Sequence, residues 1–252
     1  MDNLKLFGLI GESLKHSFSE RYFKEKFLRE GLENCDYRNF ELNSIEEFPE
    51  LVKLFPKLRA VNITMPYKEQ ILKYIDVLDE EAEKVGSVNV VTIKKYDKKT
   101  IVKGYNTDIY GVEVTLLHSL KNKNVKALIL GTGGAAKAVK YVLDKLSIEN
   151  NFVSRKSQKD AKFLYQDVSQ RVISEHKLII NTTPLGMFPK VNFCPDLNYQ
   201  FLSKEHLLID LIYNPPLTKF LQKGKDMGAT VINGEEMLIS QAEKSWEIFC
   251  SM

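Results

Sequence analysis

The segment from Val125 to Leu146 constrains the fold of this chain more than any other part of the sequence. It reads VKALIL, then GTGGAA, then KAVKYVLDKL, which predicts a short buried strand, a glycine turn and a helix. In this GxGxxA pattern Gly131 permits the tight turn, Gly133 lets the backbone approach a pyrophosphate, and Ala136 lets the helix pack on the strand. The pattern in this setting predicts a Rossmann-type dinucleotide site, and a glycine-rich turn without a ligand is the alternative.

The segment NFVSRK predicts the next strand of the same sheet, and its end bears on the choice of cofactor. NAD enzymes usually place an Asp or Glu there to bind the ribose hydroxyls, but here Ser154, Arg155 and Lys156 follow. Arg can bind a 2′-phosphate with a bidentate fork and Lys can bind it as a point charge. The residues therefore favour NADP over NAD, and a solvated basic turn is the alternative.

Strand-like and helix-like segments alternate along the 252 residues, which predicts an α/β protein of one large domain or two ordinary ones. From Val125 onward the succession is that of a doubly wound, Rossmann-type sheet. Between Arg155 and His176 there is little room for a complete helix, strand and helix, so we expect one abbreviated crossover. The last helix is expected from about Glu235 to Ser251.

Composition excludes several classes of function. A net charge of +3, spread along the chain, does not indicate a nucleic-acid partner, and no apolar run is long enough to span a membrane. The three cysteines are far apart and the four histidines form no HExxH pattern, so no metal site is expected. The start of the chain lacks a secretory signal, and we therefore expect a cytoplasmic protein.

The segment NITMPYKEQ, from Asn62 to Gln70, predicts a helix with Thr64 as its cap and Pro66 in its first position. Lys68 would then lie in the first turn, where the helix dipole disfavours a cation. A surface lysine could tolerate that position by pointing into water. A catalytic lysine could use it, because the same field would lower its pKa.

Two further features of the sequence allow both a structural and a functional interpretation. Ser17 and Glu20 form an SxxE capping box, and a helix start that offers the hydroxyls of Ser17 and Ser19 could also bind a carboxylate. Asp108 follows Asn106 and Thr107 at the start of a predicted helix, where an acidic residue is common for structural reasons alone.

The chain resembles the shikimate dehydrogenase family, on motifs that occur in the family's order over nearly the whole length. They are GxxxxHSxS from Gly11 to Ser19, NxTxPxK from Asn62 to Lys68, VN at Val88 and Asn89, NTD from Asn106 to Asp108, GTGGAA from Gly131, NTTPLGM from Asn181, DLIYNP from Asp210, and NGxxMLxxQA from Asn233 to Ala242. Each motif alone is weak evidence, but their combination is highly specific.

The resemblance implies reversible reduction of 3-dehydroshikimate to shikimate with NADPH, in the biosynthesis of aromatic amino acids. It implies a substrate-binding catalytic domain at 1–105 and 236–252, an NADP-binding Rossmann domain at 106–235, a cleft between them, and a monomer or homodimer. The catalytic pair would be Lys68 and Asp108. Substrate would be bound by Ser17, Ser19, Asn62, Thr64, Asn89 and Gln241, with Asp108 also on its ring oxygens. Cofactor would be bound by Gly131, Gly133, Gly134, Ala135, Ser154, Arg155, Lys156, Thr182, Tyr213, Gly234 and Met237.

Some residues depart from the family pattern, and other functions stay open. Glu20 replaces the usual proline after SxS, and Ser154 and Lys156 replace the Asn and Thr of the family's NRT, so the NADP prediction rests mainly on Arg155. Gln241 could simply bond backbone groups in a helix core. The rival functions are a quinate/shikimate dehydrogenase that uses NAD, a noncatalytic NADPH-binding regulator, and a folate-linked dehydrogenase, which would leave the SxS motif without a purpose.

Overall fold

The computed structural model describes residues 4–15, 17–97, 99–157 and 161–251. The chain divides into two compact units. Unit 1 is Met1–Thr107 with Ala242–Met252, and unit 2 is Asp108–Gln241. The roles and the cleft that the sequence assigns to two domains remain predictions.

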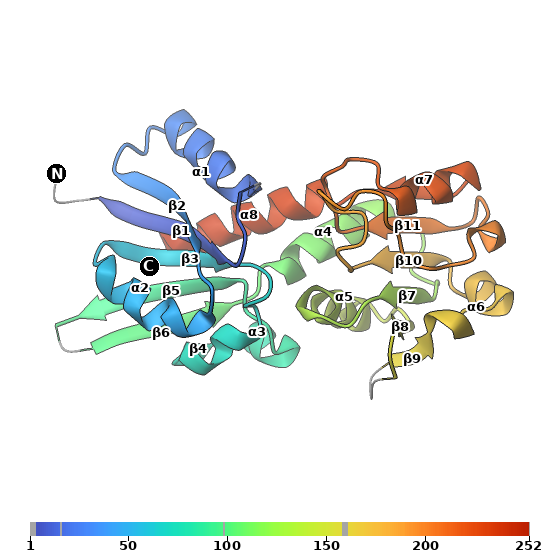
Figure 1. Cartoon of the computed structure of the whole chain (residues 1–252), viewed down its shortest axis with the longest axis horizontal. Coiled ribbons are helices and arrows are strands. Elements are labelled where there is room, and N and C mark those ends of the chain that lie inside the picture. The colour runs from blue at the N-terminus through green and yellow to red at the C-terminus, as the bar shows by residue number, and fades with distance from the viewer. Residues whose placement is uncertain (1–3, 16, 98, 158–160, 252) are drawn as a thin grey trace. The chain divides into compact units, whose positions relative to one another are not determined.

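Unit 1 is built on a six-stranded mixed sheet with the strand order β2-β1-β3-β5-β6-β4 (Figure 1). Strand β1 pairs in parallel with β2 and β3, β5 runs antiparallel to β3 and β6, and β4 pairs in parallel with β6. The strands are β1 Lys5–Gly11, β2 Cys35–Glu41, β3 Leu58–Ile63, β4 Val77–Leu78, β5 Val90–Tyr96 and β6 Lys99–Tyr105. The helices are α1 Phe18–Arg29, α2 Phe48–Leu54, α3 Glu80–Val85, the 3-10 helices Ile45–Glu47 and Gln70–Tyr74, and the C-terminal part of α8 Glu235–Cys250.

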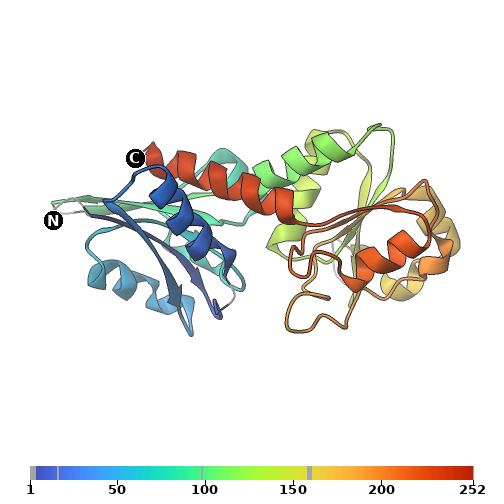
Figure 2. The same cartoon turned by 90° about the horizontal axis from the view of Figure 1, so that it is seen from above.

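Alternating residues of β1 place a core on each face of this sheet. Leu6 and Ile10 belong to a cluster with helix α2, whereas Phe7 and Leu9 belong to a cluster with α1 and α8. The second cluster is rich in aromatic rings, and Phe7 stacks on Phe249 of α8 with ring centroids 5.0 Å apart. Figure 2 shows α1 and the end of α8 side by side next to the sheet.

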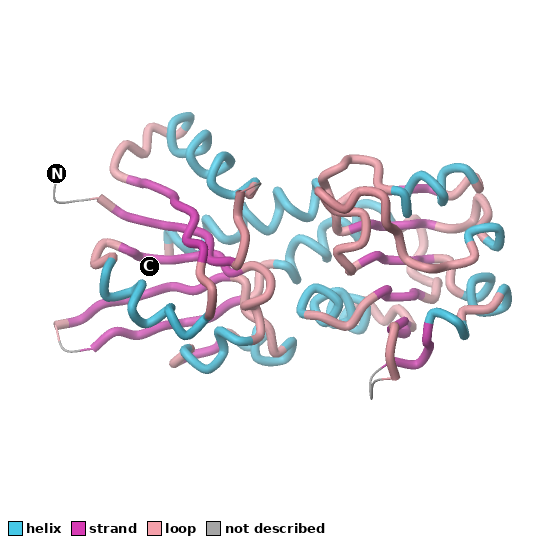
Figure 3. The backbone as a smooth tube through the Cα atoms, in the orientation of Figure 1, coloured by secondary structure: helices cyan, strands magenta, loops and turns pink. Residues whose placement is uncertain are grey.

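Unit 2 is built on a six-stranded, fully parallel sheet with the order β12-β11-β10-β7-β8-β9. Figure 3 draws the strands of this sheet in magenta and the helices around it in cyan. The strands are β7 Ala127–Leu130, β8 Asn150–Ser154, β9 Ala161–Leu164, β10 Leu178–Asn181, β11 Leu207–Asp210 and β12 Thr230–Ile232. The helices are α4 Asp108–Ser119, α5 Gly134–Lys145, α6 Gln170–Glu175, α7 Lys219–Asp226, the 3-10 helices Tyr165–Asp167 and Tyr199–Phe201, and the start of α8. The predicted α/β class with a doubly wound, Rossmann-type sheet is confirmed.

The order of the strands reverses between β7 and β10, because β8 and β9 extend the sheet on one side of β7 and β10 to β12 extend it on the other. In open α/β sheets ligands bind outside the carboxyl ends of the strands at such a point. The expected abbreviation of one crossover is also confirmed. Strand β8 ends at Ser154 and its parallel neighbour β9 begins at Ala161, which leaves too few residues for a crossover helix.

Within the described ranges, no helix is long and apolar enough to cross a membrane.

Candidate cofactor and substrate sites

The turn between β7 and α5 has the geometry that the GxGxxA pattern predicts. Gly131 has a φ of +112°, and a Cβ added there would lie 2.7 Å from the Thr182 hydroxyl oxygen. Gly133 caps α5, and a Cβ added there would meet no heavy atom of the described residues within 4 Å. Ala136 is fully buried. The first glycine is therefore required by the fold, and the second leaves open space beside the start of a twelve-residue helix.

Thr182, from the loop after β10, lies at the same place. Its backbone N–H and its hydroxyl both donate to the Leu130 carbonyl, over 3.0 and 2.7 Å. This ties the loop after β10 to the end of β7, where the order of the strands reverses. Two groups of predicted cofactor residues that are some fifty positions apart are thus neighbours in the folded chain.

The end of β8 presents the two predicted cations to solvent. Ser154 is buried and its hydroxyl accepts a hydrogen bond from the Lys156 N–H over 3.3 Å, while the side chains of Arg155 and Lys156 are exposed. The positions from Ser154 to Ser157 carry no carboxylate that could accept from ribose hydroxyls. The predicted preference for a 2′-phosphate is consistent with this local chemistry.

Asp210, at the end of β11, organises the next loop of unit 2. It is fully buried and accepts hydrogen bonds from the Thr218 hydroxyl (2.6 Å), the Asn181 amide (3.0 Å) and the Ile212 N–H (3.1 Å). Burial raises the pKa of Asp210 to about 6, although these three donors act in the opposite direction. The loop that it anchors carries Tyr213, a predicted cofactor residue. The DLIYNP motif contains Asp210, but its supporting function was not predicted from sequence.

Gly234 and Met237 occupy tightly packed positions of unit 2. The Gly234 N–H donates to the Ile212 carbonyl over 3.1 Å, and a Cβ added at Gly234 would lie 2.2 Å from the Leu211 oxygen. Met237 is buried and lies against Gly111 of α4, where an added Cβ would be 2.9 Å from the Met237 Cγ. Both positions are explained by packing, and their contact with a cofactor remains a prediction.

The helix predicted to begin at Pro66 does not form, and this prediction was wrong. Residues 65–69 form a turn, and only a 3-10 helix, Gln70–Tyr74, follows. The Lys68 carbonyl accepts from the Val88 N–H over 2.8 Å, and the Leu72 N–H donates to the Glu69 carbonyl over 3.3 Å. Because Val88, in the loop before β5, uses the carbonyl that an α-helix would need, Lys68 lies in a half-buried turn before the 3-10 helix.

The predicted capping box at the start of α1 does not form either. Ser17 is the N-cap of α1 but makes no side-chain capping bond, and the Glu20 carboxylate pairs with Lys24 over 2.6 Å instead. The Ser17 hydroxyl oxygen is buried and has no hydrogen-bond partner among the described residues. His16 of the same motif lies outside the described residues. A buried hydroxyl without a partner carries a desolvation cost, which a bound ligand could offset.

Ser19, Asn62 and Asn89 are brought together by a buried polar network in unit 1. Ser19 interacts with Tyr37, whose hydroxyl donates to the Asn62 oxygen over 2.8 Å. Asn89 bonds Thr107 through its amide (3.0 Å) and accepts from the Thr107 N–H (2.7 Å). Burial raises the pKa of Tyr37, so the hydroxyl stays neutral. The sequence motifs contain Asn62, Asn89 and Thr107, but the supporting positions of Tyr37 and Thr107 were not predicted.

Thr64, Asp108 and Gln241 are the remaining predicted substrate residues. Thr64 is half-buried in the segment after β3, where its N–H donates to the Ile10 carbonyl over 2.9 Å. Asp108 is the first residue of α4 and is buried. The Gln241 amide donates to the Leu238 carbonyl of its own helix over 2.9 Å, which is the backbone bond that the structural interpretation of this residue expected.

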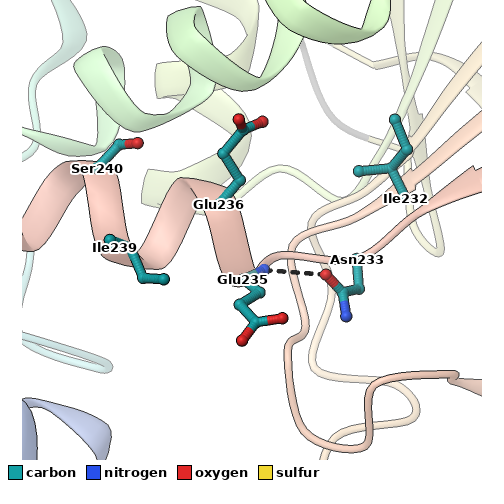
Figure 4. A pocket seen from close by; sticks show the side chains of 6 residues that line it. All are labelled: Ile232, Asn233, Glu235, Glu236, Ile239 and Ser240. Carbon is teal, nitrogen blue, oxygen red and sulfur yellow. Dashed lines mark hydrogen bonds between the residues drawn. The ribbon is translucent and has the colours of Figure 1, made fainter.

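A shallow pocket at the start of α8 contains none of the predicted residues (Figure 4). Asn233 and Glu235 both line it, and the Glu235 N–H donates to the Asn233 side chain over 3.2 Å. Two of its lining side chains, Glu235 and Glu236, are carboxylates, which would repel a phosphate or a carboxylate. This pocket is therefore not a candidate for the anionic ligands that the rest of the sequence predicts.

Comparison with known proteins gives consistent results along the whole chain. Residues 9–91 match the family model described as the shikimate dehydrogenase substrate binding domain. A shikimate dehydrogenase (NADP(+)) of Clostridium beijerinckii is 39% identical, and the match covers 98% of this chain and 92% of the relative. The crystal structure of shikimate dehydrogenase 1 from Peptoclostridium difficile matches with a TM-score of 0.85 at 36% identity, covering 99% and 92% of the two chains. A structure of the Thermus thermophilus shikimate 5-dehydrogenase, in complex with NADP(H) and shikimate, matches with a TM-score of 0.85 at 26% identity, covering 99% and 94%.

Proposed function

The chain belongs to the shikimate dehydrogenase family, and we propose on that premise that it catalyses the reversible NADPH-dependent reduction of 3-dehydroshikimate to shikimate, a step in aromatic amino acid biosynthesis. The observation that carries this proposal is the β7–α5 turn, with Gly131 at positive φ and open space at Gly133, at the point where the strand order of a parallel sheet reverses.

The residues of unit 2 fit an NADP cofactor. The N–H groups at the start of α5 and the turn from Gly131 to Ala135 would hold the pyrophosphate. Arg155 and Lys156, which are exposed directly after β8, would bind the 2′-phosphate. Thr182 is anchored to Leu130 beside this turn, and we propose that it lies on the nicotinamide side together with Tyr213, Gly234 and Met237.

When bound, NADPH supplies the hydride that reduces the ring carbonyl of the substrate. The carbonyl oxygen gains negative charge in this step, and a proton donor near it stabilises the transition state. We propose that the Lys68 ammonium donates this proton. The Asp108 carboxylate is the second member of the proposed catalytic pair.

We propose that Ser17 is the main hydroxyl donor to the substrate carboxylate. Its oxygen is buried without a described partner, whereas Ser19 already interacts with Tyr37. Asn62, Thr64, Asn89, Gln241 and Asp108 are proposed to bind the ring oxygens. The two Asn side chains are held by neighbouring side chains of unit 1, which would orient them before substrate arrives.

The test of this function is a spectrophotometric assay of the purified chain with shikimate and with quinate, each in the presence of NADP and of NAD. We expect the highest kcat/KM for shikimate with NADP. A preference for quinate and NAD would identify the quinate/shikimate dehydrogenase activity instead, and NADPH binding without turnover would identify a regulator.

A matched pair of variants tests the carboxylate site. Ser17→Ala should raise the KM for shikimate and leave the melting temperature almost unchanged, because the Ser17 hydroxyl makes no capping bond. Ser87→Ala is the control, since the Ser87 hydroxyl is also buried without a described partner but belongs to no predicted site. A Ser17→Ala variant with native KM for shikimate would contradict the proposed role of this residue.

We further propose that the enzyme acts in the cytoplasm as a monomer or homodimer. Size-exclusion chromatography with light scattering measures the oligomeric state directly, and a larger assembly would contradict that part of the proposal.

A further inference from the structure

Ser245, on α8, is the residue at which the buried polar network of unit 1 converges. It is fully buried. Its hydroxyl oxygen lies 3.0 Å from the Asn62 amide nitrogen and 3.1 Å from the Thr107 hydroxyl. Through Thr107 it is connected to Asn89, whose amide donates to the Thr107 oxygen over 3.0 Å. A single serine thus joins the side chains of two Asn residues that come from different strand ends of the same sheet.

The hydrogen bonds of this network define the orientation of the Asn62 side chain. Tyr37 donates its only hydroxyl hydrogen to the Asn62 oxygen, and Asn62 donates an amide hydrogen to Ser245. Ser245 accepts from Asn62, and either hydroxyl can be the donor in its contact with Thr107. The Asn62 side chain is therefore held with its oxygen toward Tyr37 and its nitrogen toward Ser245. Without the serine oxygen, the nitrogen would keep only a weak contact of 3.5 Å with the Asn89 carbonyl.

The orientation of such an amide matters for recognition of a polyhydroxylated ring. Rotation of an Asn side chain by about 180° exchanges a donor for an acceptor at the same place in space. A substrate hydroxyl that accepts from the amide in one orientation would face an acceptor in the other. Holding the amide in one orientation before binding removes that ordering cost from the binding step.

We propose that Ser245 is a positioning residue, which fixes the orientation of the Asn62 amide directly and that of Asn89 through Thr107. This inference rests on the proposed function, in which the two Asn side chains bind the ring oxygens of shikimate. Ser245 itself touches no substrate in this proposal.

The first experiment compares Ser245→Ala with Ser87→Ala in steady-state kinetics. Ser245→Ala should raise the KM for shikimate by about three- to tenfold, the effect of losing one ordinary buried hydrogen bond. The KM for NADP should stay native, because the polar network around Ser245 lies within unit 1 and the β7–α5 turn, which is proposed to bind the cofactor, lies in unit 2. Ser87→Ala removes an equally buried hydroxyl without a described partner, and both KM values should stay native. Equal rises in the two KM values of Ser245→Ala would indicate general loss of structure and overturn the proposal.

A double-mutant cycle separates positioning from general packing. If Ser245 acts partly through Asn62, the double variant Ser245→Ala with Asn62→Ala should lose less shikimate affinity than the sum of the losses in the two single variants, and the part that remains is the effect through Thr107 and Asn89. Additive losses would overturn the proposal. If Ser245→Ala does not fold, Thr107→Val and Thr107→Ser replace it in the test, because the first removes the hydroxyl at nearly constant shape and the second retains it. Thr107→Ser should keep the native KM for shikimate and Thr107→Val should not.

The wild-type measurement distinguishes failure of the proposed function from failure of the positioning role of Ser245. A wild-type chain that does not turn over shikimate overturns the proposed function and this inference with it. Wild-type activity together with an unchanged KM for shikimate in Ser245→Ala overturns this inference alone.

Discussion

Two turns carry predicted site residues directly after buried strands, and only one of them leads into an α-helix. After β7, the turn at Gly131 leads into the twelve-residue helix α5. After β3, the turn that carries Lys68 leads into a 3-10 helix of five residues. The sequence predicts an α-helix after each of these two turns, and the signals are equally local.

The two turns differ in whether a neighbouring or a distant part of the chain sets their backbone conformation. At Gly131 the requirement is local, since a residue at a φ of +112° is rarely anything but glycine, and the helix formers after it need no distant partner to begin a turn. At Lys68 the carbonyl is used by the N–H of Val88, about twenty residues away. Cap residues predict a helix only where no distant segment competes for its backbone groups.

The largest expected effect is that of replacing Lys68, which tests whether this residue is the proton donor. Lys68→Met should reduce kcat for shikimate oxidation by about 10² to 10⁴, the usual contribution of a general acid or base, with little change in shikimate affinity measured by direct titration. Lys73→Met is the control, because Lys73 is an exposed lysine in the 3-10 helix that follows. Near-native kcat with weakened binding would show that Lys68 positions the substrate and that the proton donor is another group.

The next effect concerns Asp210, the buried carboxylate at the end of β11 in unit 2. The pKa of Asp210 is about 6 in the folded chain and 3.8 in the reference state, so the native state binds this proton more tightly. The contribution of this proton to stability is complete below pH 3.8 and is lost as the pH rises through about 6. Relative to Asp210→Asn, the wild type should lose roughly 3 kcal/mol of unfolding free energy as the pH rises from 3.8 to above 6, because one pKa unit corresponds to about 1.4 kcal/mol.

The measurement is the difference in unfolding free energy between wild type and Asp210→Asn at several pH values from about 4 to 8. The Asn side chain can keep the network, since its oxygen can accept from Asn181 and Ile212 and its amide can donate to Thr218. Asp226→Asn, at an exposed carboxylate of the same unit, is the control. A difference that does not vary with pH would contradict the raised pKa of Asp210.

Gly131→Ala tests the claim that the β7–α5 turn requires a glycine at this position. The alanine would have to adopt a strained φ and would approach the Thr182 hydroxyl, so we expect a loss of about 1–3 kcal/mol in unfolding free energy and weaker NADP binding. Gly228→Ala, at a φ of +81° in the same unit, should lose stability but keep native NADP affinity. Native stability in Gly131→Ala would mean that this backbone conformation is not required.

The smallest expected effect concerns the exposed cation after β8. Arg155→Ala should weaken NADP binding by about tenfold and leave NAD binding unchanged, since a charge-assisted hydrogen bond at an exposed site lies at the low end of its range. Lys162→Ala removes a nearby exposed charge on β9 and should change neither. Equal losses for both cofactors would place Arg155 away from the 2′-phosphate.

Much of the fold was predicted from the sequence because its signals are local. The β7 strand, the glycine turn, α5 and the abbreviated crossover after Arg155 were all predicted from spacing and residue type. The capping box at Ser17 was not formed, because Glu20 pairs with Lys24 on its own helix instead of with the backbone. Local pattern alone could not decide between those two partners.

The sequence by itself determined the family, the α/β class and the glycine turn, because these depend on residue types at fixed spacing along the chain. Only the tertiary structure decided that Lys68 lies in a turn, that the Ser17 hydroxyl is buried without a described partner, and that Ser245 joins Asn62 to Thr107. Each of these depends on groups brought together from distant parts of the chain. A buried polar group takes whichever partner the packed core brings within reach, and no spacing rule specifies that partner in advance.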